Sequence, residues 1–376
     1  MAELKKEKTL ITTLLVFLMI FGLAGCGWRA AEPQRELAAA TKTKITDMLG
    51  REVTVSIPAD KIVAIGPGAL RLVCYVAGTD KVAGIENVEK QQPAGKPYLL
   101  AHPELLAKPV IGPGGPDSTP DAEKLASVKP DVVFVTSLVD RMQADELQAK
   151  TNIPIVVLSY GTTAVFDENV YRSLQLIGKI TGNDERAGEV IAYLKNCQQD
   201  LNTRTKDIPE TQKPKVYVGA LGMKGTHGIE STRGQYAPFV AINARNVVDE
   251  TGKTGSVMID REKLLIWDPD IIFIDAAGLK LVQEDYKKNP QFYHSLKAVR
   301  EGRLYGQIPF NYYSTNIDTA IADAYYAGKV IYPERFKDID PAQKADEIYQ
   351  FLLGRPVYEQ MAKDFGGFKK IDLARP

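Results

Sequence analysis

The side chains with the widest chemical range gather in one short stretch, residues 222–233, GMKGTHGIESTR. Lys224 and Arg233 can pair with carboxylate, phosphate or catecholate groups. His227 and Glu230 carry donor atoms that ligate metal ions. The stretch follows a predicted strand, so we expect a loop at a sheet edge that contacts a ligand. A solvated loop with satisfied polar groups is the alternative interpretation.

Tyrosines form a second group of candidates because they stand near the ends of predicted strands. Tyr98 lies in a proline-rich loop and Tyr160 ends a predicted strand, while Tyr312 and Tyr313 follow the last predicted strand. Aromatic faces suit flat or chelated ligands, and a phenolic oxygen is a hard donor that suits Fe(III). Because Tyr312 and Tyr313 are adjacent, we expect only one to face inward unless their loop is irregular.

Backbone groups in glycine-containing turns are further candidates. Pro67 and Gly68 stand between a predicted strand and a predicted helix, where free N–H groups can hold an anionic part of a ligand; a plain tight turn is the alternative. Gly114 and Gly115 lack side chains, so their backbone can approach a bulky ligand, or simply form a rim loop. Asp275 ends a predicted strand and either faces a cleft or caps the next turn.

Short apolar strands alternate with helices along most of the chain, which predicts parallel sheets covered on both faces. A hairpin is predicted over 45–57 and the longest helix over 183–206, where about 24 residues span roughly 36 Å. The block EKLASVKPDVVFVTS at 123–137 is echoed by EKLLIWDPDIIFIDA at 262–276. The chain therefore predicts an α/β fold of two Rossmann-like lobes, joined by one long helix, with a ligand cleft between the lobes at the strands' carboxyl ends.

The predicted boundaries follow from these patterns. The short segments 109–111 and 303–308 are predicted strands, and 289–299 is a predicted helix. The predicted regions are a signal peptide over 1–26, a flexible tether over 27–44, a first α/β lobe over 45–162, linking helices with the long one over 163–210, and a second α/β lobe with closing helices over 211–376.

The first residues resemble the leader of a bacterial lipoprotein. Three lysines precede the apolar run 10–23, and Leu23-Ala-Gly-Cys26 is similar to a lipobox, in which the cysteine becomes the lipidated first residue. An ordinary signal segment beside a free cysteine is the alternative. Such export permits a disulfide between Cys74 and Cys197, but each stands in an apolar helical pattern, so we expect two buried thiols.

Composition and motifs argue against several functions. The 47 basic and 47 acidic residues balance, so nothing favours nucleic acid as a partner. The chain has no Gly-x-Ser-x-Gly or His-Glu-x-x-His motif, so an anchored hydrolase using His227 is disfavoured and we predict no enzymatic activity. Three scattered histidines do not favour a bare divalent metal site, which needs about four convergent ligands.

Taken together, the chain resembles the helical-backbone substrate-binding proteins of ABC importers, which serve iron–siderophore, haem and cobalamin uptake. The resemblance runs over about residues 45–354, and the tail YPERFKDID at 332–340 is closest to the iron-complex members. It is carried, in chain order, by TDMLGREV (46–53), IVAI (62–65), VAGI (82–85), both Pro-Asp blocks, ITG (180–182) and RLY (303–305).

The resemblance implies a monomeric, extracytoplasmic receptor, lipid-anchored to the cell membrane through Cys26. It would bind a small-molecule metal complex, a ferric siderophore first and cobalamin, another corrinoid or haem as alternatives, and deliver it to an ABC permease with its ATPase. It implies no cofactor, and the identity of any directly bound metal stays open. Members often carry a permease-docking Glu in the first helix, where this chain has Arg71, so docking by another carboxylate, with Glu86 and Glu104 as candidates, or an altered pairing is expected.

Overall fold

The first elements of the fold are a hairpin at its amino-terminal edge. In the computed structural model, which describes residues 40–374 except 92, 116–117, 119 and 223–224, β1 (Thr41–Thr46) pairs antiparallel with β2 (Glu52–Ile57). The hairpin is as predicted, but β1 begins at Thr41, inside the range predicted as tether. The predicted signal peptide with Cys26, residues 27–39 of the predicted tether, and Lys224 lie outside the described residues.

The first lobe is built on a four-stranded parallel sheet whose order is β4-β3-β5-β6. Its strands are short apolar runs with nearly every residue buried, as expected for strands covered on both faces. They are β3 (Ile62–Ile65), β4 (Val82–Gly84), β5 (Val132–Val135) and β6 (Ile155–Val157). The helices of this lobe are α2 (Ala69–Val76), α3 (Asn87–Gln91), α4 (Pro97–Ala101), η1 (Pro103–Ala107), α5 (Ala122–Ser127) and α6 (Arg141–Thr151).

The second lobe repeats this plan with a five-stranded sheet in the order β13-β12-β11-β7-β9. Its strands are β7 (Lys215–Gly219), β9 (Arg245–Asn246), β11 (Ile271–Asp275), β12 (Leu304–Gln307) and β13 (Lys369–Lys370), the last antiparallel to β12. A separate ribbon pairs β8 (Ser231–Gly234) with β10 (Gly255–Met258). The helices are α9 (Ala237–Ala241), η3 (Val247–Thr251), α10 (Arg261–Trp267), α11 (Leu279–Lys288), α12 (Pro290–Ser295) and α13 (Lys297–Arg300).

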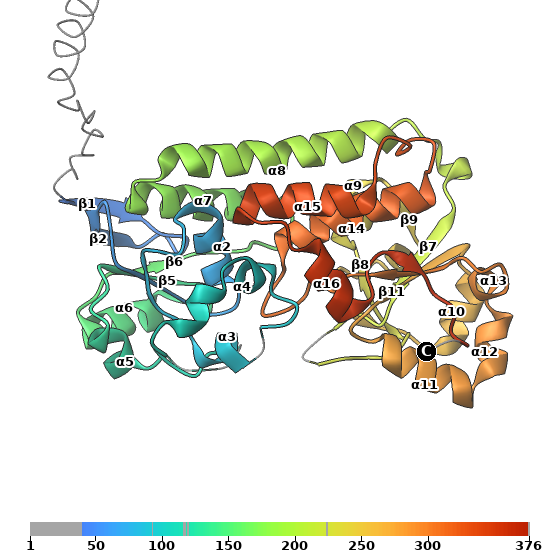
Figure 1. Cartoon of the computed structure of the whole chain (residues 1–376), viewed down its shortest axis with the longest axis horizontal. Coiled ribbons are helices and arrows are strands. Elements are labelled where there is room, and N and C mark those ends of the chain that lie inside the picture. The colour runs from blue at the N-terminus through green and yellow to red at the C-terminus, as the bar shows by residue number, and fades with distance from the viewer. Residues whose placement is uncertain (1–39, 92, 116–117, 119, 223–224, 375–376) are drawn as a thin grey trace, which may run out of the picture. The chain divides into compact units, whose positions relative to one another are not determined.

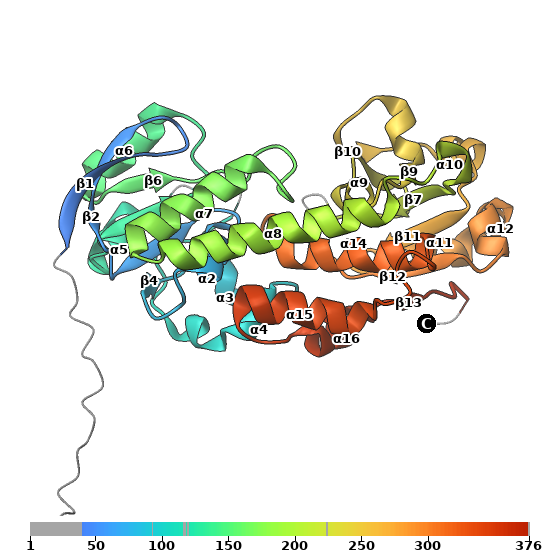
Figure 2. The same cartoon turned by 90° about the horizontal axis from the view of Figure 1, so that it is seen from above.

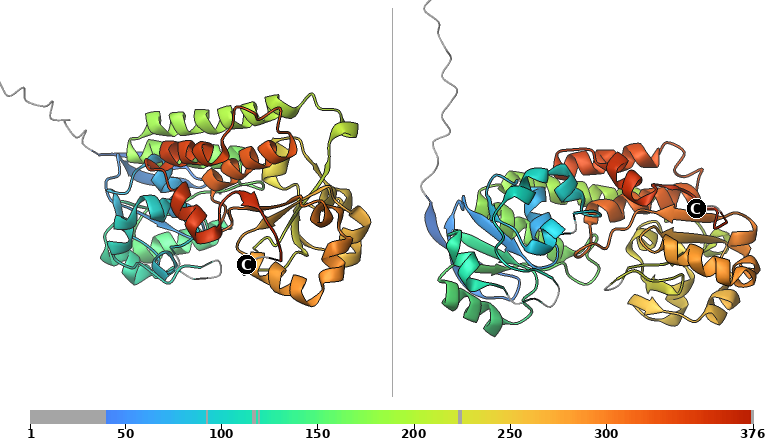
Figure 3. Two further views of the ribbon diagram at one scale, coloured as in Figure 1. Left: turned by 45° about the vertical axis from the view of Figure 1, so that its right-hand side comes forward. Right: turned by 60° about the horizontal axis from the view of Figure 1, so that its bottom comes forward.

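The long predicted helix is α8 (Asp184–Thr205), and one lobe lies beneath each of its ends (Figures 1 and 3). Asn183 occupies the N-cap position, although its side chain donates to Thr181 Oγ1 instead of capping. The fold class is therefore confirmed. The remaining linking and closing elements are α7 (Glu168–Thr181), η2 (Glu210–Gln212), α14 (Ile317–Ile331), α15 (Pro341–Leu353) and α16 (Tyr358–Phe365).

The closing helices add a second tie between the lobes that the sequence did not predict. Helices α14 and α15 run beside α8 (Figure 2), and α15 packs against α2 and α4 of the first lobe. The Arg186 guanidinium, at the start of α8, donates to the Phe351 carbonyl of α15. The lobes are linked by α8 and held again by α15, which packs against the first lobe. Together these two helices restrict how the lobes can move relative to each other.

Several local predictions differ from the structure. The predicted helix 289–299 is two short helices, because Leu296 adopts an extended conformation between α12 and α13. The predicted strand 109–111 forms only an isolated bridge between Ile85 and Val110. Cys74 and Cys197 are free and buried, as predicted.

Candidate ligand-binding site

A cavity of about 560 Å³ lies between the two lobes, and we call it the interlobe cavity. It opens where β3, β11 and β12 end, because the carboxyl ends of these parallel strands face one another across the lobes. Its lining comprises Pro67, Val88 and Lys96 from the first lobe, and Gly222, Gly225, Thr226, Asp275, Ala277, Pro309, Asn311, Tyr312, Tyr313 and Ser314 from the second. Four predicted site residues, Pro67, Asp275, Tyr312 and Tyr313, thus meet in one place.

Both adjacent tyrosines line this cavity because their loop is irregular. Tyr313 and Ser314 have φ values of 50° and 72°, so two consecutive residues are in the left-handed region. Regular extended backbone would turn successive side chains to opposite sides. The Tyr312 ring packs over Gly95, where a Cβ would lie 2.6 Å from the ring, and against Phe365, with 5.6 Å between ring centroids.

The Tyr313 hydroxyl joins the second lobe to the first. It donates to Glu86 Oε2 at 2.8 Å and accepts from the Gly115 N–H at 2.9 Å. Glu86 also accepts from the Gly66 N–H at 3.0 Å. Burial raises the pKa of Glu86 to about 7, although the hydrogen bonds from Tyr313 and Gly66 favour the ionised form and lower the pKa. Since Glu86 is only 7% exposed, it is not accessible as a permease-docking carboxylate, whereas the Glu104 side chain is exposed.

Asp275 forms the acidic part of the cavity lining. It is 2% exposed and accepts a hydrogen bond from the Ala277 N–H at 2.9 Å, so it both caps the turn after β11 and borders the cavity. Burial raises its pKa to about 7, and the single backbone hydrogen bond only partly offsets this. At neutral pH this carboxyl is partly protonated and can donate or accept a hydrogen bond.

Lys96 supplies the only basic side chain of the lining among the described residues, and its charge is already paired. Its ammonium lies 2.8 Å from Glu89 Oε2 and donates to the Val88 carbonyl at 3.0 Å. It also lies 5.3 Å from the centroid of the Tyr313 ring. Burial lowers the pKa of Lys96. Tyr98 donates to the same Glu89 and is fully buried, so the structure places Tyr98 in the core of the first lobe, away from the cavity.

Gly68 and Tyr160 pack against each other behind the cavity. Gly68 has a φ of 82°, and a Cβ there would lie 2.4 Å from the Tyr160 hydroxyl, which donates to the Gly68 carbonyl at 3.0 Å. Gly114 packs closely on Glu86 and Val88, and the Gly115 N–H donates to the hydroxyl of Tyr313, which lines the cavity. These four predicted residues support the lining without belonging to it.

Among the described residues of the stretch 222–233, those that line the interlobe cavity belong to its first half. Gly222, Gly225 and Thr226 line the cavity, whereas His227, Glu230 and Arg233 do not. Glu230 accepts from Arg261 Nε at 2.6 Å, and Arg233 belongs to β8. Lys96 and Asn311 also line the cavity but were not predicted, although each stands close to a predicted tyrosine in the sequence.

Arg71, the residue that replaces the expected docking Glu, is completely buried. Its guanidinium donates to Asn316 Oδ1, to Tyr160 Oη and to the carbonyls of the segment that carries the two cavity tyrosines. It is therefore an internal tie between the lobes and has no surface to offer a permease.

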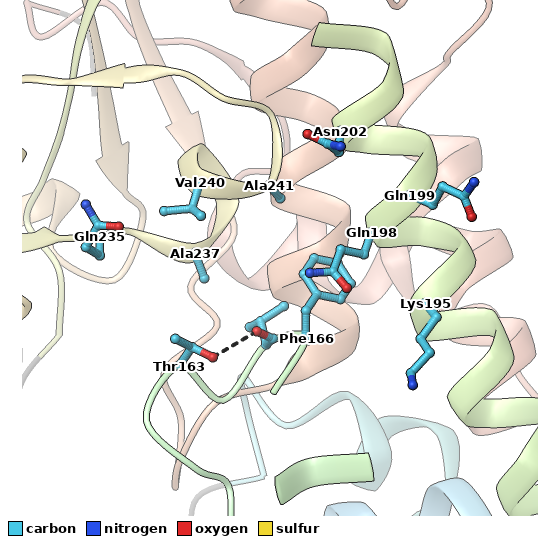
Figure 4. Close-up of a pocket in the computed structure, with 11 residues that line it drawn as sticks. Thr163, Phe166, Lys195, Gln198, Gln199, Asn202, Gln235, Ala237, Val240 and Ala241 are labelled. Atoms are coloured by element: carbon cyan, nitrogen blue, oxygen red, sulfur yellow. Dashed lines mark hydrogen bonds between the residues drawn. The ribbon is translucent and has the colours of Figure 1, made fainter. Parts of the chain in front are cut away.

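A second cavity, of about 490 Å³, lies on the flank of α8 (Figure 4). One wall comes from α8 with Lys195, Gln198 and Asn202, and another comes from residues 235–241. The segment 163–166 completes it, with Thr163 Oγ1 donating to the Val165 carbonyl at 3.3 Å. None of the predicted site residues lines this cavity.

Two searches of the described residues limit the chemistry. In the ranges 40–91, 93–115, 118, 120–222 and 225–374, no group of three or more His, Cys, Asp or Glu side chains is arranged to hold a metal ion. Within the same ranges, each helix is too short or too polar to cross a membrane.

The two α/β lobes, the spanning helix and the cavity between them define a two-lobed solute-binding protein. The chain belongs to the periplasmic binding protein family, whose model matches residues 62–308. It is the substrate-binding component of an ABC importer rather than an enzyme. Such proteins act outside the cytoplasm and work with a permease and an ATPase.

Three relatives illustrate the range of the family. The molybdate-binding protein MolA of Haemophilus influenzae is 24% identical over 327 residues, covering 81% of this chain and 89% of MolA. Its molybdate-bound structure superposes with a TM-score of 0.66 at 20% identity, over 84% of this chain and 98% of that one. An uncharacterized ABC transporter substrate-binding lipoprotein, YvrC of Bacillus subtilis, is 23% identical and covers 89% and 100% of the two chains. An iron-uptake system-binding protein of the same organism is 21% identical and covers 79% and 90%.

Proposed function

We propose that this protein captures an iron complex, a ferric siderophore or similar ferric chelate, in the interlobe cavity and delivers it to a membrane permease. The observation that carries the proposal is the cavity itself. Its volume of about 560 Å³ lies within the about 300–1,000 Å³ typical of sites for drug-sized ligands. Two tyrosine rings and glycine backbone without side chains suit a large chelate better than a bare ion.

The charge of the lining supports a bulky ligand of low charge density. Lys96 is neutralised by Glu89, and Asp275 is a partly protonated acid, so the described lining has little net charge. A small doubly charged oxyanion such as molybdate needs several unpaired donors or cations to replace its water. A ferric chelate spreads its charge over many ligand atoms and also gains contact with the faces of Tyr312 and Tyr313.

We further propose that the protein is exported, anchored to the membrane by a lipid, and delivers its ligand from there. The lipobox-like Leu23-Ala-Gly-Cys26 supports export followed by lipid anchoring at Cys26, and the relative YvrC is called a lipoprotein. An anchored monomer would present the loaded cavity to a permease in the same membrane. Haem and cobalamin or another corrinoid are the alternative ligands within this function, since a tyrosine-lined cavity also suits a flat macrocycle.

Calorimetric titration of the full chain, purified in mild detergent, tests the proposal with five ligands: ferric citrate, ferric desferrioxamine, haemin, cyanocobalamin and molybdate. We expect one-to-one binding of a ferric chelate and weaker or no binding of molybdate. Binding of haemin or cyanocobalamin alone would move the ligand to the macrocycles. Binding of molybdate alone, or of none of the five, would overturn the iron-complex proposal.

A matched pair of variants locates the binding. Asn311→Ala removes an amide from the interlobe cavity, and Asn202→Ala removes one from the second cavity. We expect Asn311→Ala to weaken ferric binding about fivefold or more, since a lost hydrogen bond is worth on the order of 1 kcal/mol, and Asn202→Ala to leave it unchanged. The reverse pattern would place the ligand in the second cavity.

A further inference from the structure

The loop 311–316 belongs to the second lobe by sequence but is held by the first. The Asn316 N–H donates to the Phe310 carbonyl at 2.7 Å, and an isolated bridge joins Asn311 to Thr315, so the loop closes on itself. Asn316 Nδ2 then donates to the Gly95 carbonyl of the first lobe at 2.6 Å. The concave side of this closed loop receives the side chain of Arg71.

All five N–H groups of Arg71 have an acceptor, which is the full capacity of a guanidinium. Nε donates to Asn316 Oδ1 at 2.7 Å, and one Nη1 proton goes to Tyr160 Oη at 3.0 Å. The remaining three go to loop carbonyls, those of Thr315 at 2.9 Å, Tyr312 at 2.9 Å and Tyr313 at 3.3 Å. None of these partners is a carboxylate. The charge of the buried guanidinium is therefore balanced mainly by carbonyl and amide oxygens of the loop 311–316.

These contacts explain why both tyrosines line the interlobe cavity. Tyr313 and Ser314 occupy the left-handed backbone region, which side-chain-bearing residues rarely adopt. In this conformation the carbonyls of Tyr312, Tyr313 and Thr315 converge on one cation. The Tyr313 hydroxyl is then directed to Glu86 and Gly115.

We propose that Arg71 is a positioning residue of the ligand site, which holds loop 311–316 on the first lobe so that Tyr312 and Tyr313 face the cavity together. The nature of the bound chelate rests on the proposed function, but the positioning of the loop does not. Lysine has three donors on one point charge and cannot reproduce the five-point contact.

Hydrogen–deuterium exchange of the full chain tests this, with Arg71→Lys as the variant and Arg51→Lys as its matched control. Arg51 is also a buried first-lobe arginine, but it binds Asp47, Asp145 and the Ile155 carbonyl, away from the loop. We expect Arg71→Lys to speed exchange of residues 310–316 about tenfold or more and to weaken ferric citrate binding by a similar factor. Arg51→Lys should change neither.

Unchanged exchange at 310–316 in Arg71→Lys, or an equal rise in Arg51→Lys, would overturn the proposal. If Arg71→Lys does not fold, Tyr160→Phe removes one Nη1 acceptor of Arg71 together with the hydrogen bond to the Gly68 carbonyl. We expect an intermediate rise in exchange at 310–316, and no rise would be equally decisive against the proposal. In Arg71→Ala, guanidinium chloride but not sodium chloride should restore protection at 310–316, which a general loss of stability would not produce. If wild type fails to bind any ferric chelate, the proposed function falls while the exchange results still decide the role of Arg71.

Discussion

Asp275→Asn is the substitution whose effect the structure predicts most quantitatively. Asp275 is 2% exposed, and burial raises its pKa from the ordinary 3.8 to about 7. A rise of the pKa from 3.8 to about 7 corresponds to about 4 kcal/mol between the two protonation states. Asparagine has nearly the same size and stays neutral at every pH.

The sign of the effect follows from proton binding. Because the pKa is raised in the folded state, folded protein holds a proton that unfolded protein has lost between about pH 4 and pH 7. The contribution of Asp275 to stability is therefore fully present below pH 4 and is lost as pH rises through 7. The free energy of unfolding of Asp275→Asn, minus that of wild type, should grow by about 4 kcal/mol from pH 4 to pH 7 and then level off.

Urea unfolding followed by circular dichroism at half-unit steps from pH 4 to 9 measures this difference. Asp270→Asn, at the other end of β11, is the control with the opposite sign. Burial opposes ionisation of Asp270, but hydrogen bonds from Lys297 and from the Lys215 N–H outweigh it and lower its pKa. Asp270→Asn should therefore destabilise the protein at neutral pH, with the loss disappearing in acid. A pH-independent difference for Asp275→Asn would refute the burial of Asp275 beside the cavity.

Two further predictions concern the tyrosine wall. Gly95→Ala places a Cβ 2.6 Å from the Tyr312 ring at a φ of 76°, so calorimetry should show weakened ferric-chelate binding. Gly252→Ala is the control, because Gly252 has a similar φ of 68° but no atom within 4 Å of the added Cβ, and it should leave binding unchanged. Equal effects of both would show that backbone strain alone is responsible. Tyr313→Phe removes two hydrogen bonds and should lower the unfolding free energy by about 1–3 kcal/mol. Tyr171→Phe, whose hydroxyl has no partner among the described residues, should cost nothing, and a comparable loss there would contradict the reasoning.

The fold was predictable because local patterns determine it. The apolar runs at 62–65 and 132–135 have the length and the β-branched content of buried strands, and the segment 184–205, which holds no Pro and a single Gly at 188, is long enough to span both lobes. The ribbon β8–β10 and the return of α15 to the first lobe were not predicted. Both depend on pairings between segments far apart in the chain, which local periodicity does not encode.

The candidate site was predictable only in part, for a related reason. Asp275 and Tyr312 stand at strand ends, so topology alone places them near a cleft. Tyr98 was predicted from its place in a proline-rich loop, yet its hydroxyl donates to buried Glu89, a partner that the sequence did not reveal. The role of Arg71 was also hidden, because its loop acceptors lie more than 240 residues away.

The measurement that tests the central claim most directly is hydrogen–deuterium exchange of the full chain with and without ferric citrate. If a ferric chelate binds in the interlobe cavity, peptides covering 275–277 and 309–314 of the second lobe and the region of Pro67 and Lys96 in the first should gain protection together. Protection confined to 163–166 and 235–241, which border the second cavity, would contradict the account. So would saturating binding without protection in either lobe.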